Sequence, residues 1–240
     1  MTAALLKTTA AGQPEEERAK ELSAELADAP AMAILERTVA DEFRGRIALV
    51  SSFGAESAVL LHLVSRTAPE TPVVFLETGK HFAQTLSYRR KLASQLGLVD
   101  VRDIRPDAAE ADREDSAGDL WRRDADACCE LRKVRPLRNA LEGFGAWITG
   151  RKAFHGGDRM ALPPVEWNGR HFKVNPLVRW SRADIAAHMA AHDLPPHPLV
   201  AQGFPSIGCW PCTRPVEDGG DVRAGRWAGS DKAECGIHVR

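Results

Sequence analysis

Five cysteines carry the most evident chemistry in this sequence. Cys128 and Cys129 are adjacent, Cys209 and Cys212 form a Cys-x-x-Cys pair, and Cys235 lies near the carboxyl end. Four thiolates in two pairs are the usual ligand set of a [4Fe–4S] cluster and equally of structural zinc. Adjacent cysteines suit one tetrahedral ion poorly, whereas a cubane offers separate irons. We therefore expect the four paired cysteines to bind a [4Fe–4S] cluster, with zinc or inert buried thiols as alternatives.

A serine-rich turn, "SSFGAES", is the second candidate site. It lies between the apolar run "IALV" and the helical pattern "SAVLLHLV", where small residues let backbone amides approach an anion at a helix N-terminus. With Gly54 as its only glycine and no Walker lysine, the turn alone also fits a plain strand-to-helix connection. "LETGK" follows the next apolar run. Because parallel sheets bind ligands beyond the carboxyl ends of neighbouring strands, both segments are expected to face one nucleotide.

Basic residues follow several of the expected elements. Lys133 falls one helical turn after Cys129, so its ammonium group is expected to reach back toward the thiolates. For the arginines around it, a solvated helix face and a functional role remain equally open. Arginine suits sulfate and phosphate because its guanidinium binds their oxygens in a bidentate manner. Besides Lys133, eight arginines and lysines lie in the segments "LRKVRPLR", "TGRKAFHGGDR" and "DVRAGRW": Arg132, Arg135, Arg138, Arg151, Lys152, Arg159, Arg223 and Arg226.

Together these segments resemble the adenylyl-sulfate and phosphoadenylyl-sulfate reductase family, in which a PP-loop and a Leu-Asp-Thr-Gly segment surround a nucleotide. The resemblance covers residues 46–240, with Glu77 where the family usually has aspartate. His155 and Gly156 also depart from the family pattern, so only Arg159 is carried over from their segment. The substrate-binding residues that the resemblance implies are Ser51, Ser52, Gly54, Glu56, Ser57, Thr78, Gly79, Lys133, Arg159, Arg223, Arg226 and His238.

The stretch "ECGIH" resembles the family's Glu-Cys-Gly-Leu-His signature, whose cysteine is the nucleophile, and Ile237 is its single change. The resemblance implies that Cys235 attacks the sulfur of adenosine 5′-phosphosulfate (APS), releasing AMP and leaving a thiosulfonate on the enzyme. A reduced thioredoxin, or a glutaredoxin-like protein, would then release sulfite. We expect Lys232, His238 and the nearby arginines to favour the thiolate, and a flexible tail to let it reach both reactants.

The four paired cysteines also bear on the substrate. Their pattern matches the cluster-bearing adenylyl-sulfate branch of the family, whereas the phosphoadenylyl-sulfate branch generally lacks them. The expected function is APS reduction in assimilatory sulfate reduction, with phosphoadenylyl-sulfate (PAPS) reduction as the first alternative. A cluster-bearing PP-loop enzyme acting on tRNA, or a zinc-containing RNA-binding module, is less favoured. The sequence has no basic arm and a single tyrosine, so no nucleic acid partner is expected.

The composition limits the partners and the cellular compartment that we expect for this protein. The chain has 240 residues, 44% of them hydrophobic, and a net charge of -1, so no whole-surface attraction to nucleic acid or membrane is implied. Its apolar runs are far shorter than the ~18 residues that a spanning helix needs. The first residues fit neither an export signal nor a transit peptide, so we expect a cytoplasmic protein whose cysteines serve metal binding or catalysis. The sequence leaves the oligomeric state open, a homo-oligomer included.

The elements that must position these residues alternate between strand and helix patterns. Apolar strand, glycine turn, amphipathic helix and second apolar strand follow one another from residue 46 to residue 79, which is typical of a βαβ unit. We therefore predict a doubly wound α/β fold with a mostly parallel sheet, N-terminal helices and a flexible C-terminal tail, of the PP-loop type that the resemblance implies. The expected parts are a helical segment at 1–45, the nucleotide-binding domain at 46–200, and a cluster loop with the catalytic tail at 201–240.

Element positions can be given more closely. Helices are expected at 14–28, 31–43, 82–96, 128–141 and 182–191, strands at 99–103 and at "AWIT", and a two-stranded ribbon at 163–177 with "WNGR" as its turn. After the last helix, proline, glycine and charge remove any periodicity, so the tail is predicted to be loop.

Overall fold

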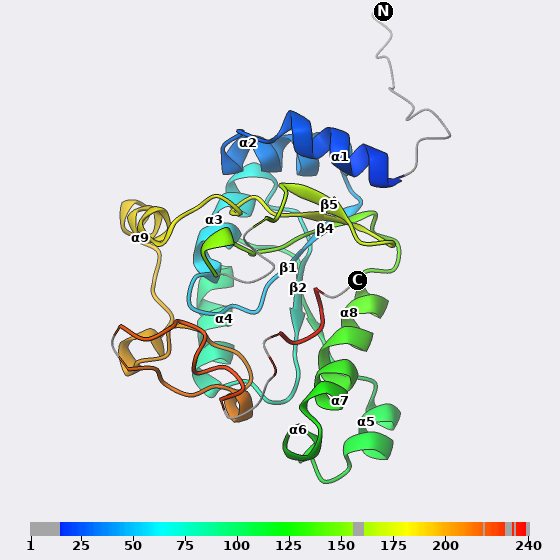
Figure 1. Ribbon diagram of the computed structural model, residues 1–240, viewed down its shortest axis with the longest axis vertical. Coiled ribbons are helices and arrows are strands. Elements are labelled where there is room, and N and C mark those ends of the chain that lie inside the picture. The colour runs from blue at the N-terminus through cyan, green and yellow to red at the C-terminus, as the bar shows by residue number, and fades with distance from the viewer. Residues whose placement is uncertain (1–14, 156–160, 218, 229–231, 233, 239–240) are drawn as a thin grey trace, which may run out of the picture.

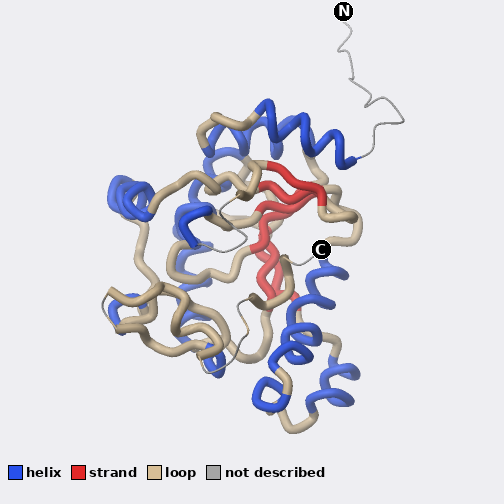
Figure 2. Tube along the Cα trace, viewed as in Figure 1, coloured by secondary structure: helices blue, strands red, loops and turns tan. Residues whose placement is uncertain are grey.

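A computed structural model of the protein describes residues 15–155, 161–217, 219–228, 232 and 234–238. At its centre is a six-stranded sheet in the order β3-β2-β1-β4-β6-β5, whose neighbouring strands are parallel except for β5 and β6. Figures 1 and 2 show helices on both sides of this sheet. The strands are β1 (Ile47–Val50), β2 (Val73–Leu76), β3 (Val101–Ile104), β4 (Ala146–Ile148), β5 (Val165–Trp167) and β6 (Phe172–Val174).

One face of the sheet is covered by five helices that share the larger hydrophobic core. Leu49 and Phe75 point into this core from the strands, and Leu22, Leu61 and Leu92 meet them from three different helices. The strand sequences "IALV" and "VVFL" are continuously apolar because both of their faces are covered. The helices are α1 (Glu15–Glu25), α2 (Ala31–Leu35), α3 (Ser57–Thr67), α4 (Ala83–Gln95) and α9 (Arg182–Ala191).

The opposite face carries the helix with the adjacent cysteines. Val74 and Trp147 point to this side and pack against Leu137. Pro136 lacks an N–H and cannot complete a regular α-helical turn, and the π-helical turn just before it accommodates the break. The segments are α5 (Ala108–Asp115), α6 (Leu120–Arg123), α7 (Ala125–Cys129), the π turn η2 (Glu130–Val134) and α8 (Arg135–Ala140).

The N-terminal helices cover an edge of the sheet. Ser23 on α1 accepts a hydrogen bond from the N–H of Val165 at 3.1 Å, so α1 lies against the outermost strand β5 (Figure 1). Glu42 binds Arg18 at 2.6 Å and Arg37 at 2.9 Å, which ties α1 to the π turn η1 (Glu36–Glu42) that follows α2. A covered edge is protected from pairing with another chain.

The segment after α9 is irregular. Its short 3₁₀ turns are η5 (Val200–Gln202) and η6 (Trp210–Cys212), and a further one, η3 (Ala153–His155), follows β4. Within the described ranges, no helix combines the length and the apolar character needed to cross a membrane.

The predicted fold class is confirmed, including the hairpin of β5 and β6 and helix α9 at 182–191. The predicted helix at 31–43 is α-helical only to Leu35 and π-helical beyond, and the strand predicted at 99–103 begins two residues later, at Val101. Helices α5 and α6 were not predicted. The side chains of α5 are largely exposed, so apolar periodicity gave no signal there.

Candidate active site

The turn between β1 and α3 is built around Phe53. This residue has a φ of 49°, which side-chain-bearing residues rarely adopt, and its ring is fully buried 5.7 Å from that of Phe75. Its backbone N–H donates to Ser51 Oγ at 3.2 Å. Gly54 has little room for a side chain, because a Cβ there would stand 3.3 Å from the carbonyl oxygen of Ile207. The core thus holds the turn in a strained conformation, a feature common at ligand sites.

A cavity of about 250 Å³ opens at this turn. Its wall combines the carboxyl ends of the central strands, the first turn of α3 and the C-terminal segment. An N-terminal helix turn favours a bound anion because its backbone N–H groups lack intrahelical partners. The sequence-predicted residues on this wall are Ser51, Ser52, Gly54, Glu56, Ser57, Lys133, Cys209, Arg223, Arg226, Cys235 and His238.

Two basic residues on the cavity wall have no site role predicted from the sequence. Arg151 and Lys152 follow β4 directly and are 7% and 4% exposed. Lys152 Nζ lies 2.8 Å from a carboxylate oxygen of Glu56. Arg151 forms an ion pair with Glu166 and donates to Asn175 Oδ1 at 3.2 Å. Basic residues that follow a buried central strand are candidates for a role in the site. The sequence alone does not show whether such side chains are buried in the site or exposed to solvent.

Arg226 is held against the backbone of the 208–213 segment. Its guanidinium carbon lies 4.5 Å from the ring centroid of Trp227. A Cβ on Gly208 would stand within 2.9 Å of Arg226 Nη1. Arg226 Nε and Trp227 Nε1 are buried, and neither has a hydrogen-bond partner among the described residues. Buried donors on a cavity wall are suited to an acceptor that a ligand brings.

The two cysteine pairs meet beside the end of β2. Trp210 donates its N–H to the carbonyl of Lys80 at 2.8 Å, and Thr78 Oγ1 lies 3.3 Å from Cys209 Sγ. From the cysteine-bearing helix, Arg132 donates to the carbonyl of Thr78 at 2.8 Å. Segments some 80 residues apart in the sequence are therefore joined through the "LETGK" stretch.

A buried ion pair supports this junction. Arg132 Nη2 binds Asp115 Oδ2 at 2.6 Å, and Asp115 Oδ1 accepts from the N–H of Leu120 at 2.8 Å. Burial opposes the charge of Asp115, but these hydrogen bonds outweigh it and lower the pKa of its carboxyl group. Arg132 therefore has a structural role here, while Arg135 and Arg138 pair with glutamates at the surface.

Burial and mutual repulsion disfavour the charged form of three of the four paired thiols. Burial raises the pKa of Cys128 and Cys129 to about 11, and the nearby charge of Cys209 adds to both shifts. Burial and then Cys209 also raise the pKa of Cys212. Thiols of this kind ionise when a metal coordinates them, so the donor set fits a metal group.

Lys133 is influenced by the charges of both cysteine pairs and of Cys235. Burial by itself would lower its pKa, but the negative charges of Cys209, Cys235 and Cys129 outweigh burial and raise it. The ammonium group is therefore a positive charge on the cavity wall beside the paired cysteines, and the link to a substrate that the sequence suggests stays a prediction.

The C-terminal tail is docked against the sheet, between the strands and α8 (Figure 1). Ile237 packs on the smaller core, and His238 stacks on Trp147 at 5.4 Å with its carbonyl bound by Lys173 Nζ at 2.9 Å. The predicted flexibility of this tail stays a prediction. Gly236 has a φ of 88°, which favours glycine in the bend next to Cys235.

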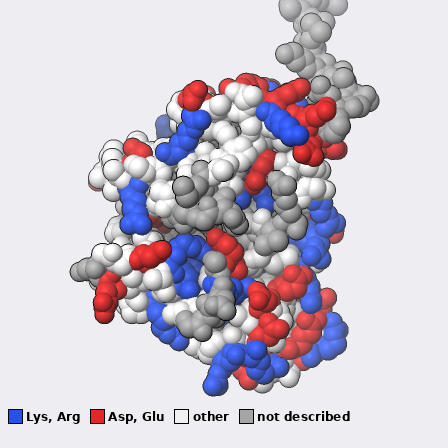
Figure 3. Space-filling view, viewed as in Figure 1, with Lys and Arg blue, Asp and Glu red and all other residues white. Residues whose placement is uncertain are grey.

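Cys235 also borders a second cavity, of about 720 Å³. This cavity lies between α7, α8 and the β5–β6 turn, and its polar wall includes Asp126, Arg138, Arg170 and Lys232. Cys235 therefore lines both cavities. Figure 3 shows basic side chains gathered near the middle of one face of the molecule, with acidic groups beside them.

Three predicted substrate residues fall elsewhere. Thr78 lies against Cys209, and a Cβ on Gly79 would face Arg132 at 3.6 Å, so both lie beside the cysteine pairs. Neither is among the described residues on the cavity wall. Arg159 lies outside the described residues.

Comparisons with known proteins agree with this geometry. Residues 46–215 match the model of the phosphoadenosine phosphosulfate reductase domain. The chain is 50% identical over 206 residues, covering 86% of it and 81% of the relative, to a protein of Mesorhizobium japonicum named adenosine 5′-phosphosulfate reductase. A Chelativorans protein of the same name is 49% identical, with coverages of 92% and 91%. The crystal structure of phosphoadenylyl-sulfate reductase from Candida auris, a phosphate complex, superposes with a TM-score of 0.72 at 27% identity, covering 84% of this chain and 98% of that one. The chain belongs to the phosphoadenosine phosphosulfate reductase domain family.

Proposed function

We propose that this protein reduces APS to sulfite and AMP in assimilatory sulfate reduction, as an oxidoreductase acting on sulfur. The observation that carries the proposal is the position of Cys235, on the wall of a cavity that also contains the turn after β1, Lys133 and Arg226. The relatives named adenosine 5′-phosphosulfate reductase support APS as the substrate.

In the first step, the Cys235 thiolate attacks the sulfur of the sulfate group of APS. A sulfur–sulfur bond forms, and the bond from sulfur to the bridging phosphate oxygen breaks, with its electron pair leaving on AMP. The product on the enzyme is Cys235 S-sulfonate. Lys133 and Arg226 are placed to offset the negative charge of the transferred group, and the first turn of α3 to bind the phosphate.

In the second step, a thiolate of reduced thioredoxin, or of a glutaredoxin-like protein, attacks Cys235 Sγ. Sulfite leaves with the bonding electron pair, and a mixed disulfide forms. The second thiol of the reductant breaks this disulfide, which restores the Cys235 thiolate and oxidises the reductant. The second cavity supports this step, since Cys235 lines it as well as the cavity proposed for the nucleotide.

The cofactor we propose is a [4Fe–4S] cluster held by Cys128, Cys129, Cys209 and Cys212. Four sulfurs around one zinc ion would stand about 3.8 Å apart, given a Zn–S bond of about 2.3 Å. Within the described part of the chain, no three cysteine sulfurs lie within 4.8 Å of one another, which favours the larger group. When bound, the cluster would tie the two cysteine segments together and tune the electrostatics around Lys133.

A PAPS reductase is the alternative from the same family, and the Candida auris neighbour carries that name. It requires a site for a 3′-phosphate in addition to the features above. Turnover of the purified protein on APS and on PAPS, with reduced thioredoxin as the electron donor, separates the two functions. We expect a strong preference for APS, and a strong preference for PAPS would overturn the choice of substrate.

The metal is tested separately, by iron, sulfide and zinc analysis of anaerobically purified protein. We expect about four irons and four sulfides per chain. One zinc in place of iron would contradict the cluster. A cytoplasmic location, where reducing proteins keep thiols available, accords with the five free cysteines.

A further inference from the structure

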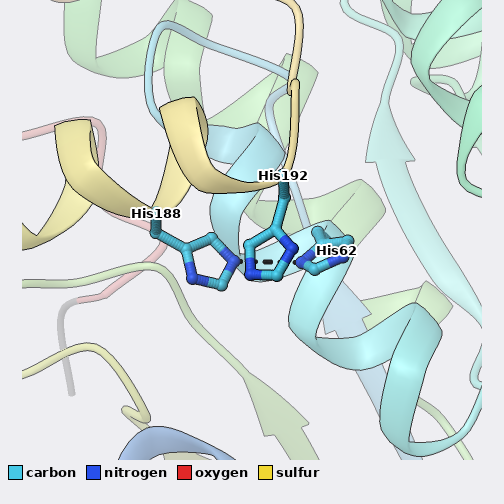
Figure 4. A group of neighbouring side chains, drawn as sticks. All are labelled: His62, His188 and His192. Carbon is cyan, nitrogen blue, oxygen red and sulfur yellow. Dashed lines mark hydrogen bonds between the residues drawn. The ribbon is translucent and has the colours of Figure 1, made fainter.

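Three histidines gather at the contact between α3 and α9, away from both cavities. His62 lies on α3, while His188 and His192 lie one turn apart at the end of α9 (Figure 4). Residues four apart on a helix share a face, so His188 and His192 both point toward α3. None of the three lines either cavity described above.

The nitrogen atoms of these rings are spaced almost as a metal ion would need. His62 Nδ1 and His188 Nε2 are 3.0 Å apart, and one nitrogen from each of the three rings lies within 4.8 Å of the others. Tetrahedral ligands at the usual Zn–N distance stand about 3.3 Å apart. His192 is exposed, so a small rotation of its side chain would close the remaining gap.

The surroundings hold His188 in place and favour the neutral form of His62 and His188. Trp180 packs edge-on against the ring of His188 at 5.3 Å. Burial, reinforced by the charge of His192, lowers the pKa of both His62 and His188. Neutral imidazole is the form that offers a lone pair to a metal. Arg66 is the nearby cation, and it also favours the neutral form of His62.

We propose that His62, His188 and His192 form a binding site for one divalent transition-metal ion, of which Zn²⁺ is the representative, with water as the fourth ligand. Such a site would join α9 to α3. Within α9, Ile185 is the one buried side chain and Met189 is partly buried against the core, so the contact of this helix with the core is small. A metal would therefore stabilise a weakly packed helix that leads, through residues 193–208, to the Cys209 segment.

The test is a titration of untagged, cluster-loaded protein with ZnCl₂, followed by calorimetry and by zinc X-ray absorption. We expect one zinc per chain, bound through nitrogen ligands and no sulfur, and a Tm that rises by about 5 to 10 °C when free zinc is 100-fold above Kd. His188→Gln and the exposed His192→Gln should each weaken binding by about 100-fold or more, since even partners outside the ligand shell contribute 10–100-fold.

Arg66→Gln is the matched control and should bind zinc as well as the wild type does, because it removes a neighbouring charge but no ligand. The proposal is overturned if the wild type binds no zinc at 100-fold excess over protein. It is also overturned if His192→Gln, folded by circular dichroism, binds zinc unchanged, or if the absorption spectrum reports sulfur ligands. The site does not depend on the proposed reductase activity.

Discussion

The guanidinium of Arg226 crosses the backbone of Gly208, where a Cβ would stand within 2.9 Å of Nη1. Thr213 also holds this segment and Arg226 together, because Gly208 donates its N–H to Thr213 Oγ1 at 3.2 Å and Thr213 pairs with Arg226 in an isolated β-bridge. The position of an arginine on the cavity wall is thus set by the loop that contains Cys209 and Cys212.

This contact predicts the effect of Gly208→Ala. The added methyl group displaces Arg226, and the loss of one charged hydrogen bond, about 1.5–3 kcal/mol, should reduce kcat/KM for APS by about 10- to 100-fold. Gly145→Ala is the matched control, since its Cβ would meet the Arg46 side chain no closer than 3.4 Å. Steady-state kinetics on both variants test this, and equal activities would contradict the proposed role of Arg226.

The pair of Lys152 and Glu56 should matter for substrate binding. Lys152→Met removes a positive charge that lies 2.8 Å from the Glu56 carboxylate on the cavity wall, and the more negative wall is less favourable for an anionic substrate. We expect KM for APS to rise at least tenfold. The double variant Lys152→Met/Glu56→Gln should recover part of this loss, because the repelling charge is gone. A KM within twofold of wild type in the single variant would exclude this role.

Asp115 should be among the most sensitive positions for stability. Asp115→Asn leaves the partly buried Arg132 without its charge partner, which costs up to about 3–5 kcal/mol. The control is Asp119→Asn, whose exposed pair with Arg123 at 3.1 Å should contribute less than about 1 kcal/mol. Urea denaturation measures both changes. Similar losses in the two variants would show that the Arg132–Asp115 pair does not hold the cysteine-bearing helix in place.

His197 predicts a pH dependence of folding. The ring is 1% exposed, with Nε2 3.0 Å from Thr85 Oγ1, and burial lowers its pKa to about 4. The unfolded chain binds a proton near pH 6.5, so stability is complete above that pH and falls as the pH drops toward 4, by up to about 3 kcal/mol. His197→Gln lacks this titration. The difference between wild type and variant in denaturation free energy should therefore shrink between pH 7 and pH 4.5, and a constant difference would contradict the prediction.

The sequence predicts the parts of the fold whose burial is periodic. The strands "IALV" and "VVFL", the helix at 182–191 and the "WNGR" hairpin all follow from local pattern. Helix α5 is not predicted by such a pattern, because few of its side chains are buried. Its local signal is a cap, since Asp107 accepts a hydrogen bond from the N–H of Glu110 at 2.9 Å.

The candidate site was predictable as a set of residues, but their contacts were not. Resemblance and spacing identified Cys235, Lys133 and Arg226, which share one cavity. The resemblance predicts Thr78 to be a substrate-binding residue, and its contact with Cys209 depends on a pairing between distant segments that no local pattern encodes. Lys152 was left unassigned because its burial depends on how the strands assemble.

A single-turnover experiment with APS labelled at its sulfur, in the absence of any thiol reductant, tests the central claim most directly. We predict that the wild type releases one AMP per chain and retains one label on Cys235, located by peptide mapping, and that Cys235→Ser does neither. If Cys235→Ser releases AMP and becomes labelled at the wild-type rate, the nucleophile is a different group and the proposed chemistry is wrong.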